Sequence, residues 1–279
     1  MIIKNTGERY TPGYDSIENG IEHWHRYLYA NEIVENMSVL DIACGTGYGS
    51  HLLSLKANNV VGIDINKQAI NLARNKYKNN NLSFKVGSVT SIPIEGRNLF
   101  DIIVSYETIE HVSEEDQVLF MKEIKRLLKP DGLLLVSTPN KEVYTDETGY
   151  KNQFHIKEFY KNEYFDFLSK FFKDVKFVEQ KTFLASYIWS EKYEQNHFKN
   201  YQLIYKDGQL EIDNNTKIGR YVIAICSDIE KNLDMQSLCL IPERIIKPDE
   251  ILDMKNSLSW KITKPLRLIK AILTGKNLS

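Results

Sequence analysis

The chain carries at residues 39–49 the stretch Val39-Leu40-Asp41-Ile42-Ala43-Cys44-Gly45-Thr46-Gly47-Tyr48-Gly49. An apolar run here ends beside a carboxylate, glycines follow at alternate positions, and residues 52–55 resume the apolar pattern. This order predicts a buried strand, a tight turn and the start of a helix. Because glycine has no Cβ, such a turn lets backbone N–H groups approach a ligand closely. The spacing is G-x-G-x-G, which differs from the G-x-G-x-x-G of dinucleotide-binding enzymes.

Beyond this turn, predicted strands alternate with predicted helices. Strands are expected at 59–64, 82–86, 99–105 and 133–137. Helices are expected at 68–78 after Asn66 and at 114–128 after Ser113, with the turn 129–132 ending the second helix. The alternation predicts an open parallel sheet with helices on both faces. Ligands of such sheets bind at the carboxyl ends of the strands, so the predicted site comprises the loops after Ile42, Asp64, Val86 and Val104.

The composition excludes several classes of protein. A length of 279 residues suggests one large domain, or one domain with an appendage. A net charge of −1 gives no sign of a nucleic-acid partner. The three cysteines are odd in number and lack metal-ligand spacing, which indicates a reducing compartment. No apolar stretch reaches the ~20 residues of a membrane-spanning helix, and the start lacks a signal-peptide pattern. We therefore expect a cytoplasmic protein.

The segment before the glycine turn is predicted to be an N-terminal lid and helix, residues 1–34. Turn formers and aromatic residues fill its first half, and residues 21–34 follow a helical pattern. Arg26 or Tyr10 could reach a ligand carboxylate, which the fork of an arginine suits well. The alternative is that this helix only packs against the domain.

Five motifs in order resemble class I S-adenosylmethionine-dependent methyltransferases. They are Val39 to Gly49, Gly62 to Ile65, Gly87 to Val89, Phe100 to Val104, and Lys129-Pro130-Asp131-Gly132. The resemblance covers roughly residues 35–182. It implies a Rossmann-like, seven-stranded, mostly parallel sheet with helices on both faces. Residues 175–180 and 219–227 would supply the last two strands, one of them antiparallel.

The resemblance also implies where S-adenosyl-L-methionine binds. The loop at Gly45 and Gly47 would carry its methionine end. Asp64, about 20 residues beyond the first glycine and followed by Ile65, would hold the ribose hydroxyls. Acidic residues at the strand ends complement the positive sulfonium. Ser88 and Val89 would meet the adenine, and Ser105 and Tyr106 the amino group. The other expected cofactor-binding residues are Asp41, Tyr10 and Arg26.

A cluster of chemically active residues follows the fourth strand, at Glu107-Thr108-Ile109-Glu110-His111. If it begins a helix, Glu107, Glu110 and His111 share one face. With the later His155 they would suit Mg²⁺ or Mn²⁺. The set resembles ubiquinone-pathway O-methyltransferases and small-RNA 2′-O-methyltransferases, in which a divalent ion binds the acceptor oxygens. In the alternative no metal binds, and His111 or His155 is the general base.

The second half of the chain adds segments to the predicted methyltransferase domain, residues 35–227. A helix is expected at 157–172, and residues 181–217 are long for a plain connection, so we interpret them as a substrate-facing flap. Residues 228–279 form a C-terminal extension, whose end, 255–279, is basic and amphipathic. This tail could bind the anionic inner face of a membrane, or pack on the domain or on a subunit of a complex.

The sequence thus leads to one main hypothesis and two alternatives. The tail and the opening segments at 8–13 and 22–27 resemble those of bacterial enzymes that assemble surface polysaccharides. The main hypothesis is O-methylation of a sugar hydroxyl, or of a phosphate-type oxygen, on a surface-glycan precursor, with or without a divalent metal. One alternative is O-methylation of a small metabolite such as a quinone precursor. The other is a non-catalytic, cofactor-binding partner in a biosynthetic complex.

Overall fold

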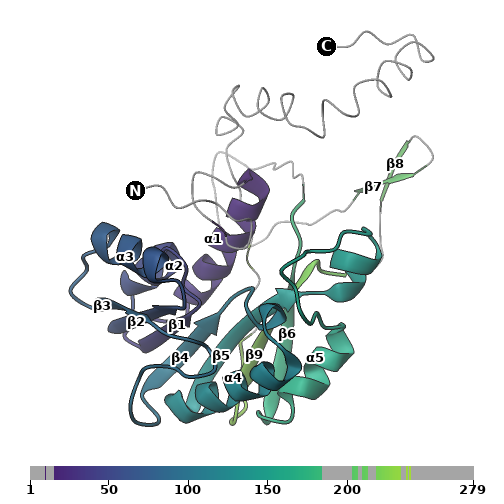
Figure 1. The fold of residues 1–279 in the computed structure, drawn as a ribbon. Helices are drawn as coiled ribbons and strands as arrows, with labels where there is room; N and C mark the ends of the chain where they lie inside the picture. The colour runs from purple at the N-terminus through teal and green to yellow at the C-terminus, as the bar shows by residue number, and fades with distance from the viewer. Residues whose placement is uncertain are drawn as a thin grey trace. The chain divides into compact units, whose positions relative to one another are not determined.

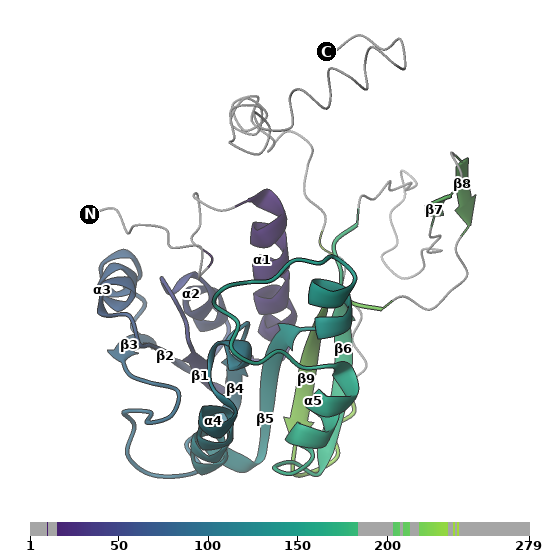
Figure 2. The same cartoon turned by 45° about the vertical axis from the view of Figure 1, so that its right-hand side comes forward.

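A computed structural model of the chain has a seven-stranded sheet at its centre (Figures 1 and 2). It describes residue 10, residues 16–183, the backbone of 203–206 and 209–212, residues 218–233, and residues 237 and 239. The strand order is β3-β2-β1-β4-β5-β9-β6. The strands are β1 (Ser38–Ile42), β2 (Asn59–Asp64), β3 (Leu82–Val86), β4 (Phe100–Ser105), β5 (Leu128–Pro139), β6 (Asp174–Gln180) and β9 (Tyr221–Ser227).

The sheet is parallel except for one strand. Strands β1 to β5 pair in parallel, whereas β9 runs antiparallel to both of its neighbours, β5 and β6. The predicted mostly parallel sheet with a late antiparallel strand is therefore confirmed. The strand order reverses beside β1, where β2 lies on one side and β4 on the other. At such a switch point the loops separate and leave a crevice at the carboxyl ends of the strands.

Both faces of the sheet are buried, because alternate residues of each strand enter different apolar clusters. In β5, Leu134 and Val136 pack in one cluster, and Leu133 and Leu135 pack in the other. The first cluster includes residues of α4 (Glu114–Leu127) and α5 (Lys161–Leu168), and the second includes residues of α1 (Ile17–Asn31) and α2 (Tyr48–Ser54). A third cluster joins α3 (Lys67–Lys76) to β3. Figure 2 shows α4 and α5 on the face of the sheet opposite α1 and α2.

The predicted helix starts at Asn66 and Ser113 are confirmed. The Asn66 side chain accepts a hydrogen bond from the backbone N–H of Ala69, at 2.9 Å. The Ser113 hydroxyl accepts one from the N–H of Asp116, at 3.2 Å. Each bond satisfies a backbone donor that the first turn of a helix leaves unpaired.

Two elements differ from the sequence-based expectation. Residues 129–132 do not form a separate turn, because β5 starts at Leu128, directly after α4, and pairs across to Phe100 with a register shift before Ile102. Helix α5 begins only at Lys161, because the preceding residues are extended and bonded elsewhere. The backbone N–H of Lys157 donates to the carbonyl of Glu110, and Phe159 forms a bridge to Asn140. The helix expected at 21–34 is α1, which begins and ends earlier.

The later segments are described only in part. Strands β7 (Leu203–Lys206) and β8 (Gln209–Ile212) form an antiparallel pair within the predicted flap. The rest of the flap beyond residue 183, and the basic tail at 255–279, lie outside the described residues. Among the described helices, none combines the length and the apolar character needed to cross a membrane.

We expect Gly49→Ala to destabilise the fold by about 3 kcal/mol, because it overpacks the contact between α1 and α2. A Cβ at Gly49 would lie 2.0 Å from the Tyr27 ring. That ring is held by Asp41 and packs edge-on against Tyr48 and Tyr106. Urea unfolding measures the loss. Gly20→Ala, inside α1, is the matched control, because its Cβ would meet only the end of the Tyr10 side chain at 3.0 Å. An equally small effect of both substitutions would contradict the packing argument.

Candidate active site

A cavity of about 430 Å³ lies at the carboxyl ends of the central strands. The loops after β1, β2, β3 and β4 all contribute to its wall, as the predicted topology requires. Residues from α1 and from the segment 144–155 complete the wall. This volume falls within the range of small-molecule sites. The cavity brings together eleven of the predicted site residues: Tyr10, Gly45, Asp64, Ile65, Ser88, Val89, Tyr106, Glu107, Glu110, His111 and His155.

The glycine turn serves the cavity through backbone geometry. Gly45 has φ +56°, a conformation that favours glycine, and a Cβ there would meet no atom within 4 Å. The position is therefore open toward the cavity that it lines. Gly47, with φ +81°, plays another part, since its Cβ would lie 2.7 Å from Ala73 and from Phe84. Gly47 lets the turn pack against α3 and β3, and it does not line the cavity.

Asp64, the last residue of β2, ties two loops together. One carboxylate oxygen accepts the backbone N–H of Gly45 at 2.9 Å, and the other accepts that of Asn66 at 2.7 Å. Each carboxylate oxygen has a further lone pair, so the group can accept hydroxyl donors from a ligand as well. Asp64 lines the cavity beside Ile65, Ser88 and Val89.

Asp41 does not line the cavity. It lies in the second apolar face of the sheet, fully buried, where it accepts hydrogen bonds from Tyr27 of α1 at 3.1 Å and from Ser50 of α2 at 2.5 Å. Its carboxylate thus joins both helices to β1. Burial raises the pKa of Asp41 to about 7, although the bonds from Ser50 and Tyr27 oppose the shift.

We expect the free energy of unfolding to decrease by about 2–3 kcal/mol between pH 5 and pH 8 because of Asp41. From its ordinary pKa of 3.8 up to about 7, the folded chain keeps a proton that the unfolded chain releases. Stability from this group is thus complete at acidic pH and is lost as the pH rises. Urea unfolding of Asp41→Asn at both pH values should show a flatter dependence. If the unfolding free energy of Asp41→Asn falls between pH 5 and pH 8 as steeply as that of the wild type, a protonated Asp41 is not the cause of the pH dependence.

Arg26 is also behind the wall of the cavity rather than in it. Its Nε donates to Gln180 at 2.7 Å, and its Nη1 lies 3.6 Å from Glu107. The guanidinium packs over the Tyr221 ring at 4.5 Å. Arg26 is fully buried, and both of its Nη atoms lack a hydrogen-bond partner among the described residues. The side chain therefore supports Glu107 directly, and it does not line the cavity in which a ligand would bind.

Of the remaining residues that were predicted to bind the cofactor, some line the cavity and one is buried in the core of the sheet. Tyr106 lines the cavity, but Ser105 is fully buried in β4 and does not. Tyr10 lines the cavity and stacks on His23, with ring centroids 4.9 Å apart. Burial, and secondarily Arg26, holds the pKa of His23 well below its usual value, so this ring is neutral.

Glu107 adopts an unusual backbone conformation. Its φ is +51°, and the following 3₁₀ turn covers only Ile109–His111, so the expected helix from Glu107 is wrong. Its backbone N–H donates to the Ser137 hydroxyl at 3.0 Å, and that hydroxyl donates to the Glu107 carboxylate at 2.6 Å. A non-glycine residue in this region costs about 1–3 kcal/mol, which persists only where the surroundings hold it. The Glu107 carboxylate is thus held by Ser137. It is not among the predicted metal ligands that come together, which are Glu110, His111 and His155.

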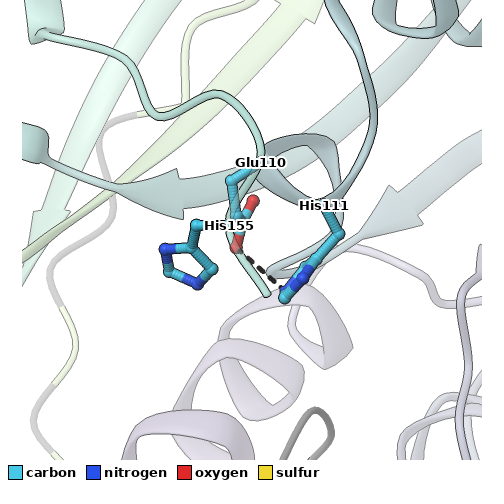
Figure 3. A group of neighbouring side chains, drawn as sticks. All are labelled: Glu110, His111 and His155. Carbon is cyan, nitrogen blue, oxygen red and sulfur yellow. Dashed lines mark ion pairs between the residues drawn. The ribbon is translucent and has the colours of Figure 1, made fainter. Parts of the chain in front are cut away.

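Glu110, His111 and His155 do come together (Figure 3). One potential ligand atom of each lies within 4.8 Å of the others, and His111 Nε2 lies 3.9 Å from Glu110 Oε1. Glu110 is fully buried, and its Oε1 has no hydrogen-bond partner among the described residues. Burial, and then the charge of Glu107, raises the pKa of Glu110 well above its usual value. Such a carboxyl resists ionising unless a cation approaches it.

The segment 152–157 positions both histidines. The backbone N–H groups of Ile156 and Lys157 donate to the Glu110 carbonyl at 2.8 and 3.1 Å. The Phe154 carbonyl lies 3.0 Å from His111 Nδ1. Because a carbonyl only accepts, Nδ1 of His111 carries the proton, and Nε2 is the nitrogen that faces Glu110. This orientation is typical of histidines that act through Nε2.

Several residues of the cavity were not predicted from the sequence. Glu22 and His23 come from α1, Tyr144, Tyr150 and Asn152 from the segment after β5, and Tyr221 from β9. Burial raises the pKa of Glu22, against a hydrogen bond with Tyr221 and the charge of Arg26. Glu22 and His23 belong to the segment 22–27, whose resemblance to other enzymes did not assign them to a site. For Tyr144, Tyr150 and Tyr221 the only sequence signal is the general abundance of tyrosine.

The chain is similar in sequence to known methyltransferases. A family model described as "Methyltransferase domain" matches residues 33–239. A "Probable S-adenosylmethionine-dependent methyltransferase" of Mycobacterium tuberculosis is 30% identical over 181 residues, 64% of this chain and 62% of that protein. A "Ubiquinone biosynthesis O-methyltransferase" of Pelagibacter ubique is 34% identical over 108 residues, 39% of this chain and 44% of that protein. The match thus spans less than two thirds of these two relatives.

A crystal structure of a Pyrococcus horikoshii protein shares the fold. Its TM-score is 0.52 at 18% identity, and the match covers 81% of this chain and 96% of that one. The family match includes all seven strands of the central sheet and the loops that form the cavity. On this evidence, the chain belongs to the family of methyltransferase domains.

Proposed function

We propose that this chain is an S-adenosylmethionine-dependent O-methyltransferase whose acceptor is a neutral hydroxyl group. One observation carries the proposal. A single cavity contains both the glycine turn with Asp64 and the group formed by Glu110, His111 and His155. The first set comes from loops after β1 and β2, and the second from segments after β4 and β5, so they flank the switch point.

The charges of the cavity suit a sulfonium cofactor. Four carboxyl groups line it, on Glu22, Asp64, Glu107 and Glu110, although burial raises the pKa values of Glu22 and Glu110. Opposite charges attract strongly where water is excluded, so such a wall favours a cation. Asp64 would accept the ribose hydroxyls, and the open backbone at Gly45 would approach the methionine end. The carboxylates of Asp64 and Glu107 would repel a phosphate bound beside them, which favours a neutral hydroxyl over the phosphate-type oxygen considered from the sequence.

The histidines would prepare the acceptor oxygen. An unprotonated Nε2 of His111 or His155 takes the hydroxyl proton, so the O–H bond breaks and an N–H bond forms. The oxygen then attacks the methyl carbon in line with the sulfur, the C–S bond breaks, and S-adenosylhomocysteine leaves. Because the cavity holds both reactants, positioning supplies much of the rate.

The three residues also fit a divalent ion. The fit rests on the buried Glu110 Oε1, which has no hydrogen-bond partner among the described residues and lies beside two imidazoles. Glu110, His111 and His155 would hold the ion, which would lower the pKa of a bound acceptor hydroxyl. With Glu107 turned toward Ser137 and Arg26, the set has two nitrogens and one carboxylate. This composition favours Mn²⁺ over Mg²⁺, because Mg²⁺ prefers oxygen ligands.

Two acceptor classes fit the cavity. Tyr144, Tyr150 and Tyr221 line the cavity with aromatic rings, against which a sugar or an aromatic ring can pack. The resemblance of the opening and terminal segments supports a sugar hydroxyl on a surface-glycan precursor. The name of the Pelagibacter relative, an O-methyltransferase of ubiquinone biosynthesis, supports the alternative of a quinone precursor.

An acceptor screen tests the proposal. Purified protein is mixed with S-adenosylmethionine and either nucleotide-linked sugars or catechol-type rings, and product masses and S-adenosylhomocysteine are measured. We expect a methyl ether from one class, with turnover reduced by EDTA and restored by Mn²⁺ if the ion acts. Methylation of nitrogen or carbon alone would overturn the proposal. Cofactor binding without any methylated product would instead favour a non-catalytic partner.

A further inference from the structure

The hydrogen bonds around His155 determine which of its nitrogens carries the proton. Asn152 Oδ1 accepts the backbone N–H of Phe154 at 3.0 Å, so the Asn152 amide nitrogen is the atom that faces His155. That nitrogen lies 3.0 Å from His155 Nε2 and can only donate. Nε2 therefore accepts and is unprotonated, which places the proton of a neutral His155 on Nδ1.

Glu158 accepts a hydrogen bond from this Nδ1–H group. Its Oε1 lies 2.5 Å from His155 Nδ1, and the side chains are 9% and 6% exposed. Its Oε2 accepts the Thr145 hydroxyl at 2.6 Å. Both carboxylate oxygens are therefore engaged, and the carboxylate cannot rotate without losing a bond. Neither Glu158 nor Thr145 lines the cavity.

The partner of Glu158 lies in a rare element. Thr145 belongs to η2 (Glu142–Asp146), a single π-helical turn that also carries Tyr144 into the cavity. Such turns are uncommon and occur frequently at functional sites. The Tyr144 ring lies 5.4 Å from the His155 ring. The same turn thus fixes a wall residue of the cavity and, through Thr145 and Glu158, the orientation of the histidine.

We propose that Glu158 is a positioning residue, which holds His155 as the Nδ1–H tautomer. The Nε2 lone pair, to which the Asn152 amide donates in this structure, is then the one that an acceptor or an ion would take in place of Asn152. The inference rests on the proposed function for its consequence in turnover, but the tautomer itself can be measured on the chain alone. A carboxylate behind an imidazole fixes its tautomer and orientation, and it stabilises the imidazolium that forms on proton uptake. Both proposed uses of His155 require the same lone pair.

The test combines a spectroscopic signature with kinetics on the full chain. ¹⁵N-histidine NMR of the protein without acceptor, assigned with His155→Gln, should show Nδ1 protonated and Nε2 unprotonated in the wild type. In Glu158→Gln a neutral amide replaces the carboxylate, which is the stronger acceptor for the Nδ1–H. The fraction of His155 in that tautomer should therefore fall, even though the Asn152 amide still donates to Nε2. We expect turnover to fall by about 10- to 100-fold, with unchanged affinity for S-adenosylhomocysteine.

Two further variants separate this role from a general loss of structure. Glu147→Gln removes the same charge from an exposed position of the same segment and should keep both the tautomer and turnover. Thr145→Val should lower turnover in the same direction, and its effect should not add to that of Glu158→Gln, because both act through one group. Thr145→Val also tests the positioning role of Glu158 if Glu158→Gln fails to fold.

The outcomes distinguish the two proposals. An Nε2–H tautomer in the wild type, or an unchanged tautomer in Glu158→Gln, would overturn the role of Glu158 whatever the activity. A wild type that shows the expected tautomer but methylates no acceptor would refute the proposed function and leave the positioning role intact. Full turnover in both Glu158→Gln and Thr145→Val would refute the positioning role, even with the methyltransferase activity established.

Discussion

Replacing Asp64 with alanine should weaken binding of S-adenosylhomocysteine by about 100-fold. Hydrogen bonds to a charged acceptor contribute about 1.5–3 kcal/mol each, and every 1.4 kcal/mol is a factor of ten in affinity. The substitution removes the acceptor for the ribose hydroxyls. It also removes the partner of the Gly45 N–H, at 2.9 Å, so the turn that approaches the methionine end loses its tie to β2. Isothermal titration calorimetry measures the change.

The control for this prediction is Asp131→Ala. Asp131 is exposed at the other end of β5, away from the cavity, so its loss changes the net charge equally without touching the site. Affinity should stay within about a factor of two. If Asp64→Ala binds S-adenosylhomocysteine as tightly as the wild type, Asp64 does not contact the ribose.

Replacing His155 with alanine should reduce turnover by about 100- to 10,000-fold, the range for loss of a positioned acid–base group. Affinity for S-adenosylhomocysteine should change little, because His155 belongs to the segment after β5 and not to the glycine turn or Asp64. A loss of turnover without a loss of affinity indicates a role in the chemistry, because a structural defect would lower both turnover and affinity for S-adenosylhomocysteine. Steady-state kinetics and calorimetry on the same preparation measure it.

His25→Ala is the matched control. His25 lies in α1, outside the cavity wall, and its Nε2 contacts Ser237 at 2.9 Å. Its removal should leave turnover at the wild-type level. Full activity of His155→Ala would exclude His155 from the chemistry and would leave His111 as the base.

Local patterns in the sequence account for the sheet, for two helix starts and for half of the cavity. Alternate apolar residues, side-chain caps at Asn66 and Ser113, and glycines at Gly45 and Gly47 act over a few residues, so they can be read without knowing the fold. The carboxyl ends of parallel strands lie on one edge of a sheet, which is why the loops around Asp64 could be assigned to a site in advance.

The errors have a common cause. Asp41 ends an apolar run just as Asp64 does, but it points into the α1/α2 face, where Tyr27 and Ser50 bind it. Glu107 was expected to share a helix face with Glu110, yet its left-handed backbone turns it to Ser137 and Arg26. In each case a partner distant in sequence decides where the carboxylate points.

The order of the motifs along the chain was enough to identify the fold, the glycine turn and the acidic residue after the second strand, because each depends on neighbours within one strand and turn. The resemblance anticipated that His155 joins Glu110 and His111, but only the tertiary structure showed how, since this contact depends on the backbone of residues 154–157 binding around Glu110. Glu158 was found only in the tertiary structure, since its proposed role depends on the π-helical turn at Thr145. Side-chain direction and hydrogen-bond partnership arise from packing between distant segments, and no local pattern in the chain encodes them.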